Sequence, residues 1–211
     1  GVLVQRDLGL RTVGAIDIRN QCSGFVYGLS VADQYIKTGM YKHVLVIGSE
    51  VHSVGLDMTD RGRGVSVIFG DGAGAMILTE SINGWISTQV YSDGKGKDGF
   101  ATPIGSTFVM DGKAVFEAGI SKLPLAITKI LNDANVRLED IDYLVPHQPG
   151  IKMLKTISEK VNFPFEKVIT VMDKYANIAA ASIPIAFHDA IKSNKIKEGQ
   201  TILLASIGSG W

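Results

Sequence analysis

The stretch AIDIRNQCSGFVYGLSVADQYIK, residues 15–37, holds the only cysteine of the chain, Cys22. Its second part carries apolar side chains every three or four positions, at Phe25, Leu29, Ala32 and Ile36. That spacing predicts a helix over residues 23–39, which Gly39 ends. The segment before it, residues 14–18, is predicted to be a short strand. Cys22 is therefore expected where a strand gives way to a helix.

The same alternation of strand and helix continues along the chain. Apolar runs predict strands over residues 43–51, 84–94, 141–147, 167–173 and 201–208, and two strands around the turn GDGAG within residues 64–81. Helical patterns cover residues 113–135, 151–161 and 177–194, whereas the Gly-rich residues 95–112 are typical of a mobile loop. This alternation predicts an α/β fold built on sheets.

A weak internal repeat suggests that the fold is duplicated. The sequence CSGFVYGLSVADQYIK, which starts at Cys22, aligns with NIAAASIPIAFHDAIK, which starts at Asn177. The strand that follows each segment also matches, with residues 44–50 aligned to residues 203–210. This alignment predicts that Cys22 and Asn177 occupy equivalent helix N-termini.

Composition excludes several classes of protein. Lys and Arg together number 21, as do Asp and Glu, so the 211-residue chain has zero net charge and offers no basic surface for nucleic acid. Apolar runs such as residues 43–51 are far shorter than the roughly 20 residues of a membrane helix. A single cysteine excludes an internal disulfide and a cysteine-cluster metal site, and it fits a reducing cytoplasm. We therefore expect no metal, no membrane partner and a cytoplasmic location.

Three polar residues are candidates for chemistry, each with a simpler alternative. A helix N-terminus would favour the thiolate form of Cys22, although a buried cysteine is often inert. His147 ends an apolar strand, where α/β sheets place ligands, although backbone groups could equally satisfy it. Asn177 precedes a helix and could simply cap it. Together the three suit thioester chemistry, with one nucleophile and two groups that hydrogen-bond a carbonyl oxygen. The other histidines, His43, His52 and His188, have no comparable context and read as surface or satisfied side chains.

Four motifs in order identify a family resemblance. They are DIRNQCSGFVYGLSVADQYIKTG, TDRGRGVSVIFGDGAGA, LVPHQPGIKML and YANIAAASIPIA. Together they resemble β-ketoacyl-acyl-carrier-protein synthase III of the thiolase superfamily, and the resemblance covers essentially the whole chain. The spacing between His147 and Asn177 also fits this family.

The resemblance implies a Cys-His-Asn triad of Cys22, His147 and Asn177. Cys22 would take the acyl group of an acyl-CoA, and malonyl-acyl-carrier protein would then lose CO2 and condense with it. His147 and Asn177 would bind the malonyl thioester carbonyl, while the backbone N–H groups of Cys22 and Ser209 would form the oxyanion hole. No metal or organic cofactor is implied.

Further positions follow from the resemblance less directly. Arg61 resembles a residue near the adenine end of CoA, Phe69 and Phe116 resemble tunnel residues, and Lys152 resembles part of a carrier-protein docking patch. The sequence HQPG departs from the family's usual His-Gln-Ala-Asn, so that Gly150 replaces an asparagine near the pantetheine arm. The sequences YANIAA and GSG also replace the usual Gly-Asn-Thr/Ser and triple-glycine patterns. These departures leave open which acyl donor is used.

The implied fold is thiolase-like, with two related halves in five layers, α-β-α-β-α, and a homodimer is expected. Residues 1–83 would be the remainder of the N-terminal half, and residues 84–211 the C-terminal half. Family members exceed 300 residues, so we expect the fold to be incomplete and truncated at both ends. Two alternatives stay open: acyl transfer or condensation in secondary metabolism, and an inactive fragment or structural partner.

Overall fold

The computed structural model describes residues 1–82, 84 and 86–211. The α-helices are α1 (Val2–Asp7), α2 (Gly24–Lys37), α3 (Arg63–Ser66), α4 (Gly112–Ala134), α5 (Ile151–Val161), α6 (Met172–Tyr175) and α7 (Ser182–Lys192). The strands are β1 (His43–Glu50), β2 (Gly72–Thr79), β3 (Phe100–Ala101), β4 (Val109–Met110), β5 (Tyr143–Pro146) and β6 (Ile202–Ala205). The short 3-10 turns are η1 (Gln21–Ser23), η2 (Asp60–Gly62), η3 (Gly94–Gly96), η4 (Leu138–Asp140), η5 (Phe165–Lys167) and η6 (Ala179–Ala181).

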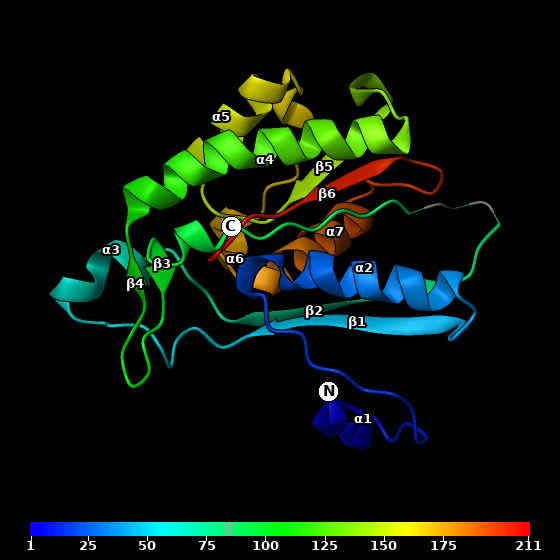
Figure 1. Ribbon diagram of the computed structural model, residues 1–211, viewed down its shortest axis with the longest axis horizontal. Helices are drawn as coiled ribbons and strands as arrows, with labels where there is room; N and C mark the ends of the chain where they lie inside the picture. Colours follow the sequence, from blue (N-terminus) through cyan, green and yellow to red (C-terminus); the bar gives the residue numbers. More distant parts are fainter. Residues whose placement is uncertain (83, 85) are drawn as a thin grey trace.

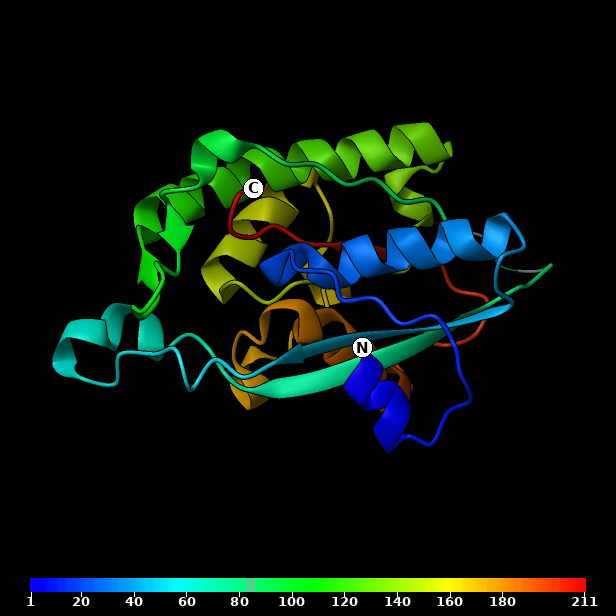
Figure 2. The ribbon, with the colours of Figure 1, turned by 60° about the horizontal axis from the view of Figure 1, so that its bottom comes forward.

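Helices and sheets stack in layers (Figure 1). Helices α4 and α5 cover one face of the β5–β6 sheet, and α2 and α7 lie between that sheet and the β1–β2 sheet. Helix α1 lies on the far side of β1–β2 in both ribbon views and buries none of its residues (Figures 1 and 2). The α-β-α-β-α order predicted from the sequence is confirmed, with α1 as the only helix of the fifth layer in the described chain.

The two main sheets differ in strand direction. Strands β1 and β2 run antiparallel, with His43 opposite Thr79 and Glu50 opposite Gly72. Strands β5 and β6 run parallel, so the chain between them must cross over, and it does so through α5, α6 and α7. Parallel pairing brings the carboxyl ends of β5 and β6 to the same edge, where His147 follows Pro146.

Apolar side chains form two cores, one on each side of the β5–β6 sheet. The first joins α2 and α7 to both sheets and includes Phe25, Val46, Val145 and Ile183, all of which are buried. The second lies beneath α4 and α5, with Ile157 at its centre. Both cores follow the helical spacing of apolar residues in the sequence.

The predicted helices are largely confirmed, and local signals explain their ends. Helix α5 has the predicted bounds, and α4 is within one residue of its prediction. The side chain of Asp111 accepts hydrogen bonds from the backbone N–H groups of Lys113 and Ala114, which caps α4. Asn135 and Asn162 end α4 and α5 in the left-handed conformation, a common way for a helix to stop.

The internal repeat is confirmed as a structural feature, but its predicted register is wrong by three residues. Turn η1 leads into α2 as η6 leads into α7, and Gln21 and Ala179 both have φ of 40° at the start of these turns. The residue that matches Cys22 is therefore Ala180, and Asn177 precedes the second turn. The many small residues of both segments allowed the sequence to align in more than one register.

Four strand predictions are wrong. Residues 14–18 form no strand, residues 64–81 form α3 and the single strand β2, and residues 167–173 contribute only an isolated bridge between Val168 and Leu144. The described part of residues 84–94 forms no strand either, because the side chains of α2 hold it. Tyr27 donates to the carbonyl of Tyr91, and Lys37 donates to that of Ile86.

Two further sequence expectations have separate outcomes. The GDGAG segment is not a turn between strands, since Gly72 and Gly74 lie within β2. A side chain at Gly74 would contact Pro184 of α7 at 2.9 Å, so glycine allows the helix to approach. The boundary between the halves at residues 83 and 84 stays a prediction, and residues 83 and 85 lie outside the described part.

We predict that Gly48→Ala destabilises the fold by separating β1 from η6. A Cβ atom at Gly48 would lie 2.6 Å from the carbonyl oxygen of Ala180 and 2.9 Å from the backbone nitrogen of Ala181. Backbone atoms cannot rotate away as a flexible side chain can, so the free energy of unfolding should fall by about 1–3 kcal/mol. Urea unfolding followed by circular dichroism measures this change. Gly112→Ala is the matched control, because its Cβ would meet no atom within 4 Å; equal stability of the two variants would contradict the prediction.

Candidate active site

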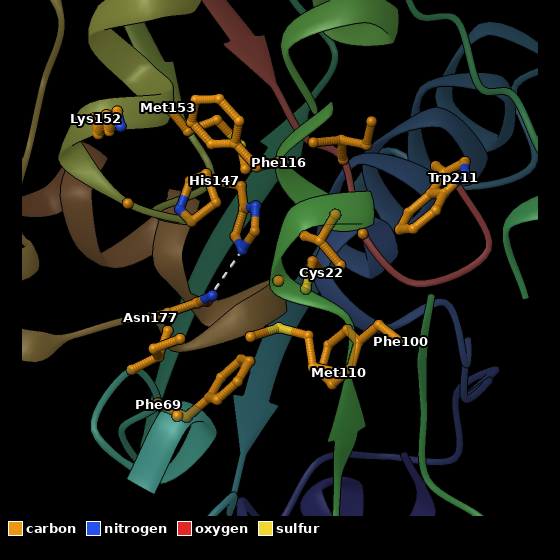
Figure 3. A pocket seen from close by; sticks show the side chains of 18 residues that line it. Cys22, Phe69, Phe100, Met110, Phe116, His147, Lys152, Met153, Asn177 and Trp211 are labelled. Atoms are coloured by element: carbon orange, nitrogen blue, oxygen red, sulfur yellow. Dashed lines mark hydrogen bonds between the residues drawn. The ribbon is translucent and has the colours of Figure 1, made fainter. Parts of the chain in front are cut away.

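A cavity of about 280 Å³ lies where segments distant in the sequence meet (Figure 3). Its walls include Cys22 from η1, His147 after β5, and Asn177 before η6. The side chains of all three are buried, at 3–4% exposure. The structure therefore brings together the three residues that the sequence singled out for chemistry.

Cys22 packs against the last segment of the chain, residues 206–211. The hydroxyl of Ser206 donates to the carbonyl of Cys22 at 2.7 Å. A Cβ atom at Gly208 would lie 2.7 Å from the Cβ and 3.2 Å from the sulfur of Cys22. Only a glycine at position 208 lets the final turn lie this close to the cysteine.

Burial raises the pKa of the Cys22 thiol to about 12, with a smaller contribution from the negative charge of Glu50. Hydrogen bonds from the backbone N–H groups of Cys22 and Ser209 oppose this rise without cancelling it. The expectation of a resting thiolate is therefore wrong. The N-terminus of α2 supplies partial positive charge, but the loss of hydration in a buried site is the larger effect.

His147 and Asn177 form the polar side of the cavity. The Nε2 atom of His147 lies 3.0 Å from Oδ1 of Asn177, and the backbone N–H of Ala179 donates to the same oxygen at 2.9 Å. Because an N–H group can only donate, this contact fixes the orientation of the Asn177 amide. His147 must then carry its proton on Nε2 and donate it to Asn177.

His147 is neutral at physiological pH. Burial lowers its pKa to about 4, and the hydrogen bond to Asn177 only partly offsets this effect. Its Nδ1 atom is buried without a hydrogen bond of regular geometry among the described residues, while the backbone of Ile207 also favours the charged form of the ring. In this state the imidazole offers one N–H donor and no positive charge.

The backbone around this pair is fixed by further hydrogen bonds. The N–H of Asn177 donates to the carbonyl of Ile68, and the N–H of Gly70 donates to the carbonyl of Asn177, both at 3.0 Å. Gln148, which is fully buried, donates to two backbone carbonyls and accepts from the N–H of Val171 at 3.0 Å. These contacts limit the movement of the side chains that face the cavity.

The backbone N–H groups of Cys22 and Ser209, which were predicted to form an oxyanion hole, both favour the charged form of the Cys22 sulfur and lower its pKa. The hydroxyl of Ser209 donates to the carbonyl of Phe100 at 2.5 Å, which fixes this turn against β3. Two donors beside a nucleophile can stabilise the negative oxygen that forms when a thioester is attacked.

Most of the other predicted positions also lie at the cavity. Phe69, Phe116, Gly150 and Lys152 line it, and the ammonium group of Lys152 lies 5.7 Å from the ring centre of Phe116. Arg61 is not part of the lining: its side chain is 87% exposed and donates to Asp57 at 3.0 Å.

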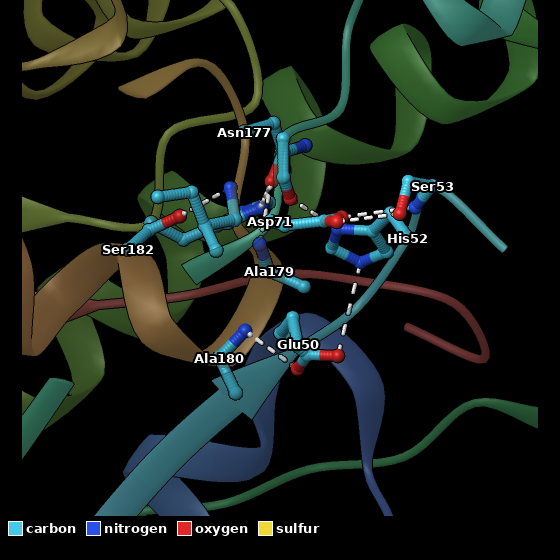
Figure 4. Close-up of polar contacts among 11 residues, drawn as sticks. Glu50, His52, Ser53, Asp71, Asn177, Ala179, Ala180 and Ser182 are labelled. Atoms are coloured by element: carbon cyan, nitrogen blue, oxygen red, sulfur yellow. Dashed lines mark hydrogen bonds and ion pairs between the residues drawn. The ribbon is translucent and has the colours of Figure 1, made fainter. Parts of the chain in front are cut away.

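Sequence reasoning missed several residues of the site. Phe100, Met110 and Trp211 line the cavity, although two of them belong to a segment that was read as a mobile loop. The indole of Trp211 packs against Gly96 and Gly99, so the glycines of this segment were the available signal. Glu50 and His52 lie behind Asn177 (Figure 4), and no local pattern distinguished them.

The structure gives two further findings about the described residues. No group of three or more His, Cys, Asp or Glu side chains is arranged to hold a metal ion. No helix in the same part of the chain is long and apolar enough to cross a membrane.

Comparison with known proteins agrees with this geometry. A model described as 3-oxoacyl-[acyl-carrier-protein] synthase III matches residues 16–94, and the model of the C-terminal part of that family matches residues 131–211. Beta-ketoacyl-[acyl-carrier-protein] synthase III of Ehrlichia canis is 43% identical, over 99% of this chain and 68% of the relative.

Two crystal structures show the likeness of the fold. The 3-oxoacyl-[acyl-carrier-protein] synthase III from Aquifex aeolicus has a TM-score of 0.95 and 38% identity, over 99% of this chain and 68% of that one. The priming beta-ketosynthase from the R1128 polyketide biosynthetic pathway has a TM-score of 0.91 and 27% identity, over 99% and 66%. Fold and site define the class as thiolase-like acyltransferases. The chain belongs to the 3-oxoacyl-[acyl-carrier-protein] synthase III family and spans about two thirds of its relatives' length.

We predict that alkylation of Cys22 by iodoacetamide is slow at pH 8 and keeps rising up to at least pH 10. The thiolate is the reactive form, and a pKa of about 12 instead of 9.0 lowers its population at pH 8 by about a thousandfold. Mass spectrometry over a pH series measures the rate. The same protein unfolded in urea is the control, and its rate should level off above pH 9. A plateau near pH 8 in the folded protein would disprove the raised pKa.

We also predict that Gly208→Ala displaces Cys22 and blocks its reaction with a thioester. The added methyl group would contact Cys22 closely enough to move either the final turn or η1. A displacement of about 1 Å at a reacting group can cost about a hundredfold in rate. Acylation kinetics by intact mass measure the loss, with Gly94→Ala as control because its Cβ would meet no atom within 4 Å. Equal acylation rates would show that the contact is not critical.

Proposed function

We propose that this protein catalyses the decarboxylating condensation of an acyl-CoA primer with malonyl-acyl-carrier protein, the first step of fatty-acid synthesis. One observation carries this proposal. Cys22, His147 and Asn177 come from three distant segments and meet in one buried cavity. The membership of the chain in the 3-oxoacyl-[acyl-carrier-protein] synthase III family supports the same reaction.

In the first half-reaction, the sulfur of Cys22 attacks the thioester carbonyl of acyl-CoA. The bond from carbon to the sulfur of CoA breaks, an acyl-Cys22 thioester forms, and CoA leaves as a thiol with the proton that Cys22 gives up. The N–H groups of Cys22 and Ser209 donate to the transient oxyanion. Because burial raises the pKa of Cys22, the thiolate is a minor form before substrate binds.

In the second half-reaction, malonyl-acyl-carrier protein enters and its thioester carbonyl lies beside His147 and Asn177. As CO2 leaves and negative charge moves onto that oxygen, the amide NH2 of Asn177 donates to it, and the Nε2–H of His147 turns from Oδ1 of Asn177 to the same oxygen. The resulting carbanion attacks the carbonyl carbon of acyl-Cys22, and the C–S bond breaks. The products are 3-oxoacyl-acyl-carrier protein, CO2 and the Cys22 thiolate, which takes up a proton from water to regenerate the thiol, with no cofactor required.

The residues at the cavity and on α5 support an acyl carrier protein and an acyl chain as the partners. Lys152 lies at the cavity, and α5 also carries Lys155 and Lys160, which together suit an acidic carrier protein. Phe69 and Phe116 give the acyl chain an apolar wall. We further propose that the protein acts as a homodimer in the cytoplasm, and that the exposed Arg61 contacts CoA outside the cavity.

A second candidate is a related condensation in secondary metabolism. The structural likeness to the priming beta-ketosynthase of the R1128 polyketide pathway favours it. At Gly150, a Cβ atom would meet nothing within 4 Å, which leaves room beside the cavity for a different acyl donor. Comparing malonyl-acyl-carrier protein with other acceptors in the assay separates the two candidates.

We predict that brief exposure to a panel of acyl-CoAs adds one acyl group to the protein, and that Cys22→Ala abolishes the adduct. His147→Ala should still acylate but should lose condensation by about a hundredfold or more, because it removes a donor to the developing negative charge. Intact mass measures the adduct, and released CO2 measures condensation. Absence of an adduct on the protein would reject the acyl-enzyme mechanism and favour a structural role. An adduct that survives in Cys22→Ala would place the nucleophile elsewhere.

A further inference from the structure

Glu50 and His52 form a polar pair outside the cavity, beside the segment that runs from Asn177 to Ala180 (Figure 4). Glu50 ends β1, and His52 lies two residues further along the chain. Oε2 of Glu50 lies 3.7 Å from Nε2 of His52, with side-chain exposures of 23% and 8%. Neither residue has a place in the reaction proposed above, yet each is connected to Asn177 by hydrogen bonds.

Glu50 is connected to the side chain of Asn177 through turn η6. Its Oε1 atom accepts from the N–H of Ala180 at 3.2 Å. The neighbouring N–H, that of Ala179, donates to Oδ1 of Asn177 at 2.9 Å, and His147 donates to the same oxygen. A shift of the turn would therefore change the direction in which both donors of the cavity point.

His52 is connected to the backbone of Asn177 through Gly70. A carbonyl can only accept, so the 2.7 Å contact between Nδ1 of His52 and the carbonyl of Gly70 places a proton on Nδ1. The N–H of Gly70 in turn donates to the carbonyl of Asn177 at 3.0 Å. The ring of His52 also packs against Phe69, with 5.0 Å between ring centres, and Phe69 lines the cavity.

Glu50 and His52 thus fix Asn177 through two separate sets of hydrogen bonds, and the charge of Glu50 also acts on Cys22 in the cavity. Burial raises the pKa of Glu50, while the Ala180 N–H and His52 favour its charged form. The negative charge of Glu50 contributes to the raised pKa of Cys22. Asp71, which accepts from the N–H and hydroxyl of Ser53, is the other carboxylate that faces His52.

We propose that Glu50 and His52 are positioning residues that align Asn177 and His147 with the malonyl thioester. This inference rests on the proposed condensation and deepens it, since it names two residues outside the cavity that orient the groups needed for the decarboxylating half-reaction. Glu50 holds the turn that orients the Asn177 amide, and His52 holds the strand-like segment that fixes its backbone. The acyl-transfer half-reaction depends on Cys22 and Ser209, which neither residue contacts.

The test compares both half-reactions in Glu50→Ala, Glu50→Gln, His52→Ala and His52→Gln. Glu50→Ala and His52→Ala should lower condensation by about 10- to 100-fold, the cost of a small misplacement of a catalytic group. The conservative variants keep an oxygen for the Ala180 N–H or a donor for Gly70, so they should recover most of that loss. Glu198→Gln, which removes a carboxylate from an exposed turn, is the matched control.

A second readout separates positioning from a purely structural role. Removing the charge of Glu50 should lower the pKa of Cys22, so Glu50→Gln should be alkylated by iodoacetamide several-fold faster at pH 8. Faster alkylation of Glu50→Gln together with slower condensation by Glu50→Ala supports the proposal. A parallel loss of both half-reactions and of thermal stability in Glu50→Ala would show that Glu50 only supports the fold, and condensation by Glu50→Ala within twofold of Glu198→Gln would also overturn the proposal.

Failure of the proposed function would be visible separately. If the unaltered protein forms no acyl adduct, the condensation itself is rejected. Hydrogen exchange at the Ala179 and Ala180 amides then still tests the contacts, and faster exchange in Glu50→Ala than in Glu198→Gln is the expected result. Unchanged exchange would show that Glu50 does not hold the turn.

Discussion

The orientation of the polar groups in the site depends on one atom, the side-chain oxygen of Asn177. It accepts from the N–H of Ala179 and from His147, and these two donors together decide how the amide is turned and which nitrogen of His147 carries the proton. With Oδ1 occupied in this way, the amide NH2 is left for a substrate. The position of turn η6 fixes Oδ1 of Asn177, and the 3.0 Å hydrogen bond from this oxygen to His147 then orients both the Asn177 amide and the imidazole.

Burial shifts the pKa values of Cys22 and His147 in opposite directions and leaves both side chains uncharged. It keeps Cys22 protonated and His147 neutral, because either charged form would lose its hydration in the cavity. A neutral imidazole with its proton on Nε2 suits the stabilisation of a developing enolate. It can donate a hydrogen bond to the enolate oxygen without first losing a proton from Nδ1. The thiol reacts slowly, because its raised pKa leaves little thiolate, and in the proposed reaction the N–H groups of Cys22 and Ser209 offset this by donating to the negative charge that forms.

Sequence patterns predicted the elements whose causes are local. The bounds of α5 and the end of α4 followed from helical spacing and from Asn135 and Asn162. Residues 86–92 could not be assigned in this way, because side chains of α2 hold them through contacts about 50–65 residues away. Motifs singled out the three residues of the proposed triad, whereas the raised pKa of Cys22 depends on burial that no short stretch of sequence reveals. Glu50 was missed for the same reason, since its partner Ala180 is 130 residues distant.

The two copies of the repeated unit differ in how their turns use backbone N–H groups. In η6, the N–H groups of Ala179 and Ala180 are bound by Asn177 and Glu50, so the turn is fixed and has no donor to offer a substrate. In η1, the N–H of Cys22, the residue equivalent to Ala180, acts on its own sulfur and has no other partner among the described residues. In the proposed reaction, turn η6 therefore positions the donors for decarboxylation, and turn η1 keeps a donor beside the nucleophile. Because the turns pack against each other, Glu50 can influence both: it holds the first turn by a hydrogen bond, and it acts on the second by charge alone.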